Sequence, residues 1–151
     1  MSGRMRSTGI RGRRRGKGRP AGRGTLGTLA LTLLAALAAP VACDGHAMTP
    51  EEAAVLTDGG SATKGAAAIS AYGCGTCHMV SGVPGATAVV GPPLAGIGQR
   101  SYVGGVLPNT PENLVRWIQH PREVSPRTAM PDLGVSERDA RDIAAYLYTL
   151  K

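Results

Sequence analysis

Apolar positions after residue 60 recur with a helical period, and no segment alternates in the manner of a β-strand. From about Ala62 to Tyr72 the chain is rich in alanine, a strong helix former, and Ile69 and Tyr72 share one helix face. Gly73 ends this helix, because glycine readily adopts the left-handed conformation of a helix C-terminus. The pattern predicts the first of three main helices in an all-α domain.

A second helix is predicted to begin after the N-cap Thr110 and to end at His120, before Pro121. Pro111 suits the first helical position, because its missing N–H would have no intrahelical partner there. Large apolar residues recur at helical spacing in this segment, namely Leu114, Trp117 and Ile118. We therefore expect one face of the helix to pack against the core.

A third helix is predicted to begin after the N-cap Ser136, with Asp139 as the acidic partner of a capping box. The apolar stripe that we expect to face the core consists of Ala140, Ile143, Ala144 and Leu147. The polar residues that we expect to point mostly outward are Glu137, Arg138, Asp139, Arg141 and Asp142.

Charge divides the chain at residue 43. Nine of the 17 Lys and Arg residues, and none of the 10 acidic residues, precede that position, although the whole chain has a formal net charge of +7. The remainder carries eight basic residues against ten acidic ones, a net charge of −2. The positive charge therefore belongs to the N-terminal segment, and a nucleic-acid partner is not expected.

The basic N-terminal segment is followed by an apolar run at residues 25–39, which is typical of an export signal. The run is shorter than the ~20 residues that a spanning helix prefers, and an uncleaved membrane anchor is the alternative. Pro40-Val41-Ala42-Cys43 resembles a bacterial lipobox, with Pro40 where leucine is usual. We predict a signal peptide over residues 1–42 and a lipoprotein acylated at Cys43 on the periplasmic face of the inner membrane; a free thiol at Cys43 is the other alternative.

Residues 43–60 contain few large apolar side chains and are predicted to be a flexible tether. A domain at residues 61–151 remains, and the whole sequence has no Phe. So small a domain buries a limited fraction of its surface and commonly needs a cofactor, metal or cross-link to complete its core. We expect the chain without such a group to be largely unfolded.

The segment Cys74-Gly75-Thr76-Cys77-His78 has the spacing of a c-type haem attachment site. Two thiols separated by two residues can form thioethers with the two vinyl groups on one edge of the porphyrin. The next residue is then carried under the ring, where its imidazole can ligate the iron. The predicted cofactor is one covalent haem c, with its iron.

Two other uses of a Cys-x-x-Cys pair are less well supported by the sequence. A zinc site needs two further thiol or imidazole ligands in partner spacing, but Cys43, His46 and His120 are isolated. A thioredoxin-like redox pair needs a strand before it and a βαβ pattern around it, and neither is visible.

A six-coordinate iron requires a second ligand from the opposite side of the ring. The candidates are Met130, Met79, His120, Met48 and His46. Met79 is adjacent to His78 and cannot reach across the ring, whereas Met130 lies in a proline-stiffened loop that would hold a thioether in place. Met130 is the predicted ligand, and a core methionine is the alternative interpretation of that residue.

The chain from about residue 62 to its end resembles a class I c-type cytochrome, in particular the small bacterial monohaem proteins of aerobic respiratory chains. The matching pieces are Tyr72 to His78, Gly91-Pro-Pro-Leu94, Asn109-Thr-Pro-Glu-Asn-Leu114, Thr128-Ala-Met-Pro131 and Ala145-Tyr-Leu147. The resemblance implies an all-α fold in which three main helices and their loops surround one haem. It also implies that Gly65 and Tyr72 lie against Tyr146 and Leu147, where the first and last helices cross.

The resemblance also implies roles for residues around the haem. Pro92 would accept a hydrogen bond from His78, Leu94 would line the haem pocket, and Arg100, Tyr102 and Trp117 would approach the propionates. Ordinary core aromatics and a solvated arginine are the alternatives for the last three. The loop after His78 is unusually rich in Gly and Val, so core packing cannot be transferred in detail.

The expected function is one-electron transfer by a non-enzymatic monomer, with partners such as a quinol:cytochrome c reductase and a terminal oxidase. A permanent subunit of an oxidase or dehydrogenase complex is one alternative. A ligand-binding or peroxidase-like haem protein, in which Met130 is labile or absent from the iron, is another.

Overall fold

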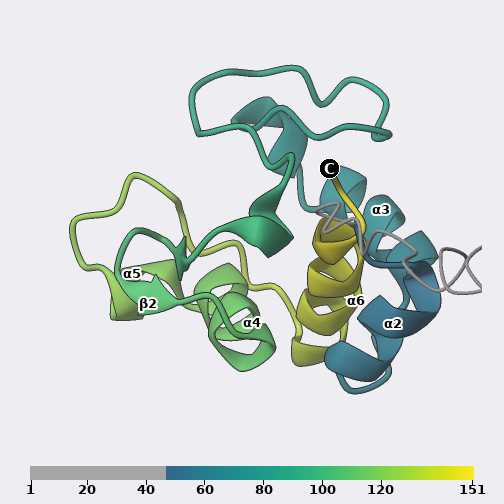
Figure 1. Cartoon of the computed structure of the whole chain (residues 1–151). Coiled ribbons are helices and arrows are strands. Elements are labelled where there is room, and N and C mark those ends of the chain that lie inside the picture. The colour runs from purple at the N-terminus through teal and green to yellow at the C-terminus, as the bar shows by residue number, and fades with distance from the viewer. Residues whose placement is uncertain (1–46) are drawn as a thin grey trace, which may run out of the picture. The chain divides into compact units, whose positions relative to one another are not determined.

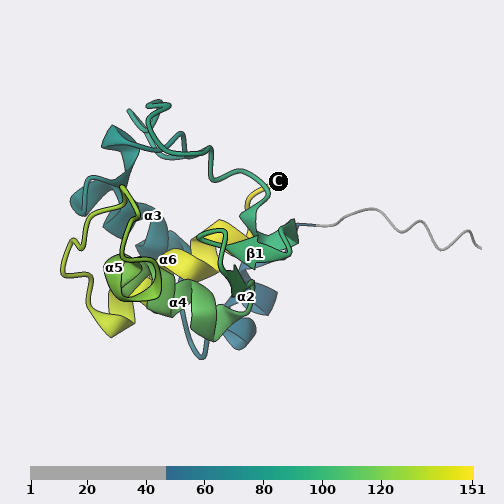
Figure 2. The same ribbon diagram turned by 90° about the vertical axis from the view of Figure 1, so that its left-hand side faces the viewer.

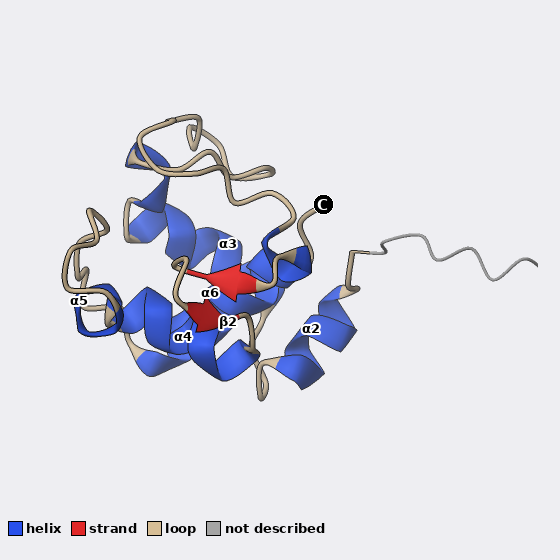
Figure 3. Ribbon diagram, turned by 60° about the vertical axis from the view of Figure 1, so that its left-hand side comes forward, coloured by secondary structure: helices blue, strands red, loops and turns tan. Residues whose placement is uncertain are grey.

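The structure is a computed structural model that describes residues 47–151 of the chain, and five helices dominate this part (Figure 1). The helices are α2 (Pro50–Leu56), α3 (Ala62–Ala71), α4 (Pro111–Gln119), α5 (Pro121–Val124) and α6 (Glu137–Tyr148). Single 3₁₀ turns lie at η2 (Cys74–Thr76) and η3 (Ile97–Gln99). Figure 3 shows long loops between η2 and η3 and between α5 and α6.

The three main helices occur where the apolar pattern predicts them. Each follows a hydroxyl N-cap: Ser61 accepts from the Lys64 N–H, Thr110 from the Asn113 N–H, and Ser136 from the Asp139 N–H. The all-α prediction is confirmed. The departure from it is a two-residue antiparallel pair, β1 (Tyr102–Val103) with β2 (Leu107–Pro108), in which Val103 is opposite Leu107.

The core lies where α3 and α4 pack against α6, and the turned view in Figure 2 shows α4 beside α6. Its larger buried residues include Ile69, Leu114, Ile118, Ile143, Leu147 and Tyr148. The predicted inner stripe of the third helix is buried in full. Polar groups are also accommodated: burial raises the pKa of Tyr148 to about 12, and its hydroxyl lies 3.4 Å from the Asn109 side-chain oxygen.

Helices α3 and α6 approach each other most closely at Gly65. A Cβ atom at this position would lie 2.0 Å from the Asp142 carbonyl oxygen and 2.9 Å from the Tyr146 Cβ. The two backbones can therefore be this close only because Gly65 has no side chain. The expected crossing of the first and last helices is present.

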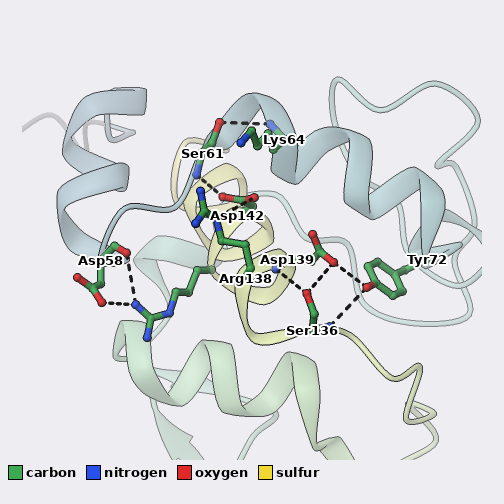
Figure 4. Close-up of polar contacts among 9 residues, drawn as sticks. Asp58, Ser61, Lys64, Tyr72, Ser136, Arg138, Asp139 and Asp142 are labelled. Atoms are coloured by element: carbon green, nitrogen blue, oxygen red, sulfur yellow. Dashed lines mark hydrogen bonds and ion pairs between the residues drawn. The ribbon is translucent and has the colours of Figure 1, made fainter.

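Asp142 is buried, so the prediction that it points outward was wrong. The residue is 2% exposed, and its Oδ1 accepts a hydrogen bond of 2.6 Å from the Ser61 backbone N–H (Figure 4). Arg138 also lies 3.9 Å from the other carboxylate oxygen. The charge is tolerated inside because it is paired and hydrogen-bonded, which the helical period alone does not reveal.

The prediction of a flexible tether at residues 43–60 was wrong for residues 50–56, which form α2. A capping box begins the helix: the Thr49 N–H donates to Glu52 at 2.8 Å and the Glu52 N–H donates to Thr49 at 3.2 Å. Ala53 is fully buried on a face that packs against α6. Directly after this helix, Asp58 also forms an ion pair with Arg141 of α6.

The signal peptide, the acylation site at Cys43 and the candidate ligand His46 lie outside the described residues. Within residues 47–151, no helix has both the length and the apolar character required to cross a membrane.

Replacing Gly65 by Ala should reduce the free energy of unfolding of the haem-loaded protein by ~1–3 kcal/mol, because the added methyl overlaps backbone atoms of α6 that cannot rotate away. Denaturant unfolding monitored by circular dichroism measures the change. The control is Ala67→Ser, which adds one atom at an exposed position of the same helix and should cost ~0.5 kcal/mol. Equal effects of the two substitutions would contradict the close approach.

Candidate haem-binding site

The two thiols of the Cys-x-x-Cys motif lie on one tight turn. Gly73 has a φ of 71°, which reverses the chain at the end of α3 and leads into the 3₁₀ turn η2. The Cys74 carbonyl then accepts hydrogen bonds from the Cys77 N–H at 3.2 Å and from the His78 N–H at 3.0 Å. This turn holds both sulfurs and the imidazole in one short, ordered segment, as a covalent attachment to one porphyrin edge requires.

The Cys74 thiol does not have the environment of a nucleophilic cysteine. Both thiols are free and half-buried, and burial raises the pKa of the Cys74 thiol, an effect that the neighbouring Cys77 reinforces. Reactive thiols in proteins have the opposite shift, because the thiolate is the nucleophile. In residues 47–151 there is also no group of three or more His, Cys, Asp or Glu side chains close enough to hold a metal ion.

His78 is oriented by the backbone of the Gly91–Pro93 segment. Its Nδ1 lies 2.7 Å from the Pro92 carbonyl oxygen, so the expected hydrogen bond between these residues is present. A carbonyl oxygen can only accept, and Nδ1 must therefore carry the proton. The proton-free nitrogen is Nε2, which is the atom needed to ligate a metal.

Gly91 also helps to fix the position of this imidazole. Its N–H donates to the Cys77 carbonyl at 2.7 Å, and a Cβ at this position would lie 2.4–2.9 Å from three atoms of the His78 ring. The absence of a side chain at Gly91 therefore allows the ring to lie against the backbone. The fit of Gly91 and Pro92 around His78 is the geometry expected of a fixed metal-ligating histidine.

The loop at residues 79–91 is anchored near both ends and carries exposed apolar side chains. The Tyr146 hydroxyl, from α6, donates to the Ser81 carbonyl at 2.6 Å, the Gly91 N–H donates to the Cys77 carbonyl, and the loop residues Val80, Val83 and Ala86 are buried. Its exposed large apolar residues are Met79, Val89 and Val90. Uncovered apolar side chains beside the thiols and His78 suit a large apolar cofactor.

The remaining residues assigned by resemblance have the following positions. Leu94 and Trp117 are half-buried and pack against the core, and the Trp117 ring lies against Gly104. Tyr102 is 61% exposed. Arg100 donates through one guanidinium nitrogen to the Pro93 and Ala95 carbonyls, so it stiffens the turn that follows Pro92.

The apolar pattern did not indicate the role of Asn109. Its amide group donates to the Ile97 carbonyl at 2.7 Å and to the Arg100 carbonyl at 2.9 Å, which holds the turn η3 in place. An asparagine directly before the N-cap of a helix was the available signal, but its distant partners could not be read from the sequence.

Met130 is half-buried in the loop between α5 and α6, and its N–H donates to the Thr128 side chain at 3.2 Å. His120, the alternative ligand, is exposed at the junction of α4 and α5. It borders a shallow cavity of about 490 Å³ between α2, α4 and α6, which is lined by neither thiol nor by His78. Met79 is 42% exposed, and Met48 packs against the core.

A hydrogen-bond network connects the end of α3 to the start of α6 (Figure 4). The Tyr72 hydroxyl donates to Asp139 Oδ2 at 2.8 Å and accepts from the Ser136 N–H at 3.4 Å. The Ser136 hydroxyl also donates to Asp139 Oδ2, at 2.7 Å. The hydroxyls of Ser136 and Tyr72 lower the pKa of the Asp139 carboxyl by stabilising its charged form.

This network corrects one detail of the predicted capping box. The Ser136 side chain accepts from the Asp139 N–H as expected, but the Ser136 N–H donates to Tyr72 and not to the Asp139 carboxylate. An aspartate is one methylene shorter than the glutamate of a complete capping box, and a residue distant in sequence provides the missing acceptor.

The fold, the Cys-x-x-Cys-His turn and the held imidazole together define a haem-carrying electron-transfer domain. Comparison with known families agrees: the Cytochrome c family model matches residues 62–151, and the chain belongs to this family. The family carries covalently bound haem c, and Cys74, Cys77 and His78 fit that group.

Among curated proteins, the chain is similar to "Cytochrome c oxidase subunit 2" of Alkalihalophilus pseudofirmus strain OF4, with 37% identity over 79 residues. The match covers 52% of this chain and 22% of that protein, so the chain corresponds to about a fifth of its relative. The comparison with solved structures gave no significant match.

Replacing Gly91 by Ala should displace the His78 ring and weaken its bond to Pro92, because the methyl would overlap the imidazole. With His78 as an iron ligand, the Pro92 carbonyl would make the imidazole more basic and favour ferric iron, so weakening this hydrogen bond should raise the reduction potential. A tenfold change in the ratio of the His78 affinities for ferric and ferrous iron corresponds to a shift of about 59 mV in the reduction potential. Protein-film voltammetry measures the shift; Val89→Ala, at an exposed neighbouring position, is the control. An unchanged reduction potential in the Gly91 variant would contradict the role of Gly91 in positioning the His78 ring.

Proposed function

We propose that the domain is a one-electron carrier with a single haem c, attached through Cys74 and Cys77 and ligated by His78 and Met130. The observation that carries this proposal is the His78–Pro92 hydrogen bond, which places the proton of a neutral imidazole on Nδ1 and so leaves Nε2 available to ligate iron. The haem would supply the iron that alternates between the ferrous and ferric states.

The residues of the chain would hold that iron in one coordination geometry in both states. The turn at Cys74–Thr76 fixes the attachment edge, while Pro92 and Gly91 fix the imidazole. A methionine opposite a histidine favours the ferrous state and raises the potential relative to two histidines. If His78 and Met130 both hold the iron, they would leave it no free position for a substrate, and a carrier of this kind would require no acid, base or nucleophile.

We propose a place for this carrier in an aerobic respiratory chain, with a terminal oxidase as acceptor and a quinol:cytochrome c reductase as donor. The similarity to an oxidase subunit 2 supports the acceptor. The same similarity favours a second candidate, a haem-bearing subunit that remains bound to an oxidase. Co-purification of a stable stoichiometric complex from membranes would favour the subunit over the shuttle.

Partner recognition would depend little on long-range charge. Residues 65–99 contain no Asp, Glu, Lys or Arg, and this uncharged segment includes the attachment motif and the Val89–Val90 surface. Electrostatic steering requires complementary charged patches, so contacts near this segment would have to rely on shape and apolar burial.

The proposed location is the periplasmic face of the bacterial inner membrane. The basic and apolar N-terminal segments support export, and Cys43 after Ala42 supports acylation. Export would also suit covalent haem attachment outside the cytoplasm.

Replacing Met130 by Ala should abolish the weak far-red absorption band that marks a methionine sulfur on ferric haem, and should allow carbon monoxide to bind the ferrous protein at neutral pH. The reason is that removal of the thioether opens one axial position. Absorption spectroscopy of the purified holoprotein measures both effects. Met79→Ala removes an exposed methionine next to His78 and should change neither. An unchanged Met130→Ala spectrum would refute the ligand assignment.

The intact mass of the mature protein from membranes tests the haem number and the anchor together. We expect the mass of residues 43–151 plus one haem and the acyl groups on Cys43, because the signal peptide is removed when the cysteine is modified. A second haem, or a chain that retains residues 1–42, would contradict this part of the proposal. Cys43→Ser is the control: it should lack the acyl mass and, because removal of the signal peptide follows modification of the cysteine, should retain residues 1–42.

A further inference from the structure

The Tyr72–Ser136–Asp139 network lies between the two chain segments that bear the proposed haem ligands. Tyr72 is at the end of α3, two positions before Cys74. Ser136 and Asp139 are at the start of α6, directly after the loop that contains Met130. These three residues thus connect the end of α3, just before the attachment motif, to the end of the loop that contains Met130 (Figure 4).

The Met130 loop has few other connections. In the part of the chain that the structure describes, the hydrogen bonds of residues 126–134 are local, as in Thr128 to Ser125, Met130 to Thr128, and Gly134 to Asp132. The hydrogen bonds to other elements occur at the end of the loop, where the Val135 carbonyl accepts from Gln119 at 3.3 Å and the Ser136 N–H donates to Tyr72. Val135 is also buried, whereas residues 131–134 are exposed.

We propose that Tyr72 is a positioning residue for the Met130–iron bond and that it acts through Ser136 and Asp139. The inference rests on the proposed ligation by Met130. The phenol oxygen is both donor and acceptor in this network, so it fixes the side chain of Asp139 and the backbone of Ser136 together. When Met130 leaves the iron and the loop moves away, the hydrogen bond to the Ser136 N–H is the contact most directly exposed to that movement.

Tyr146 provides a matched comparison. It belongs to the same α3–α6 pair, and its hydroxyl also makes a hydrogen bond to another segment, the Ser81 carbonyl of the 79–91 loop. That loop is on the His78 side, where thioethers already hold the chain to the haem. Loss of the Tyr146 hydroxyl should therefore reduce the stability of the fold without selectively releasing Met130.

The test uses ferric holoprotein and imidazole, which binds the iron only after Met130 leaves. Its apparent affinity therefore reports the equilibrium between bound and released methionine. Tyr72→Phe should tighten imidazole binding about two- to tenfold, the change expected from loss of one net hydrogen bond. Tyr146→Phe should change it less than twofold. Denaturant unfolding, followed by far-ultraviolet circular dichroism, separates this effect from a general loss of stability.

Asp139→Asn is a second variant, for which we expect an intermediate effect on imidazole affinity. An amide oxygen can still accept from the Tyr72 hydroxyl, but more weakly than a carboxylate, so the increase in imidazole affinity should be smaller than in Tyr72→Phe.

Equal imidazole affinities in Tyr72→Phe and Tyr146→Phe, or an effect that follows unfolding stability alone, would overturn the role of Tyr72. Failure of the ligand assignment gives a different result. In that case Met130→Ala would leave both the far-red band and the imidazole affinity unchanged.

Discussion

The close approach of α3 and α6 at Gly65 is the contact on which the position of the haem site depends. The attachment turn leaves the end of α3, and the proposed methionine loop enters the start of α6, so the angle and separation of these helices set the relation between the two segments. A Cβ at Gly65 would be 2.0 Å from a carbonyl oxygen of α6. The absence of one side chain thus permits the arrangement, and Asp142 stabilises it from the opposite helix by accepting from Ser61.

The helical pattern, the N-caps and the Cys-x-x-Cys-His motif were readable from the sequence because each depends on residues within a few positions of one another. Asp142 was misassigned because the helical period distinguishes faces but not a buried acceptor for a distant N–H. The helix at Pro50–Leu56 was missed although a local signal was present, because Thr49 and Glu52 have the spacing of a capping box around Pro50. The alanines that follow become a packing face only when α6 is present, so a tertiary partner decided the case of Asp142 and only part of the case of this helix.

The candidate site likewise combines local features that the sequence indicates with tertiary contacts that it does not. The Pro92 contact with His78 could be expected only from resemblance to a family, since the two residues are fourteen positions apart and no local pattern indicates that they meet. The Tyr72 contact with Asp139 bridges an even longer interval and has no motif of its own. Hydrogen bonds between loops and helix ends therefore carry much of the site geometry that sequence patterns leave undetermined.

The proposed ligand set places unequal demands on the two sides of the haem. On the His78 side, two thioethers and the Pro92 carbonyl would keep the imidazole near the iron even if the loop moved. On the opposite side the thioether sulfur of Met130 would form a weaker, breakable bond, and the Met130 loop makes mostly local hydrogen bonds. Retention of that ligand in both oxidation states must then come from the ends of the loop. The contacts of Val135 and Ser136 with α4 and α3 are suited to this task, because they join the loop to the helices that already fix the covalent side.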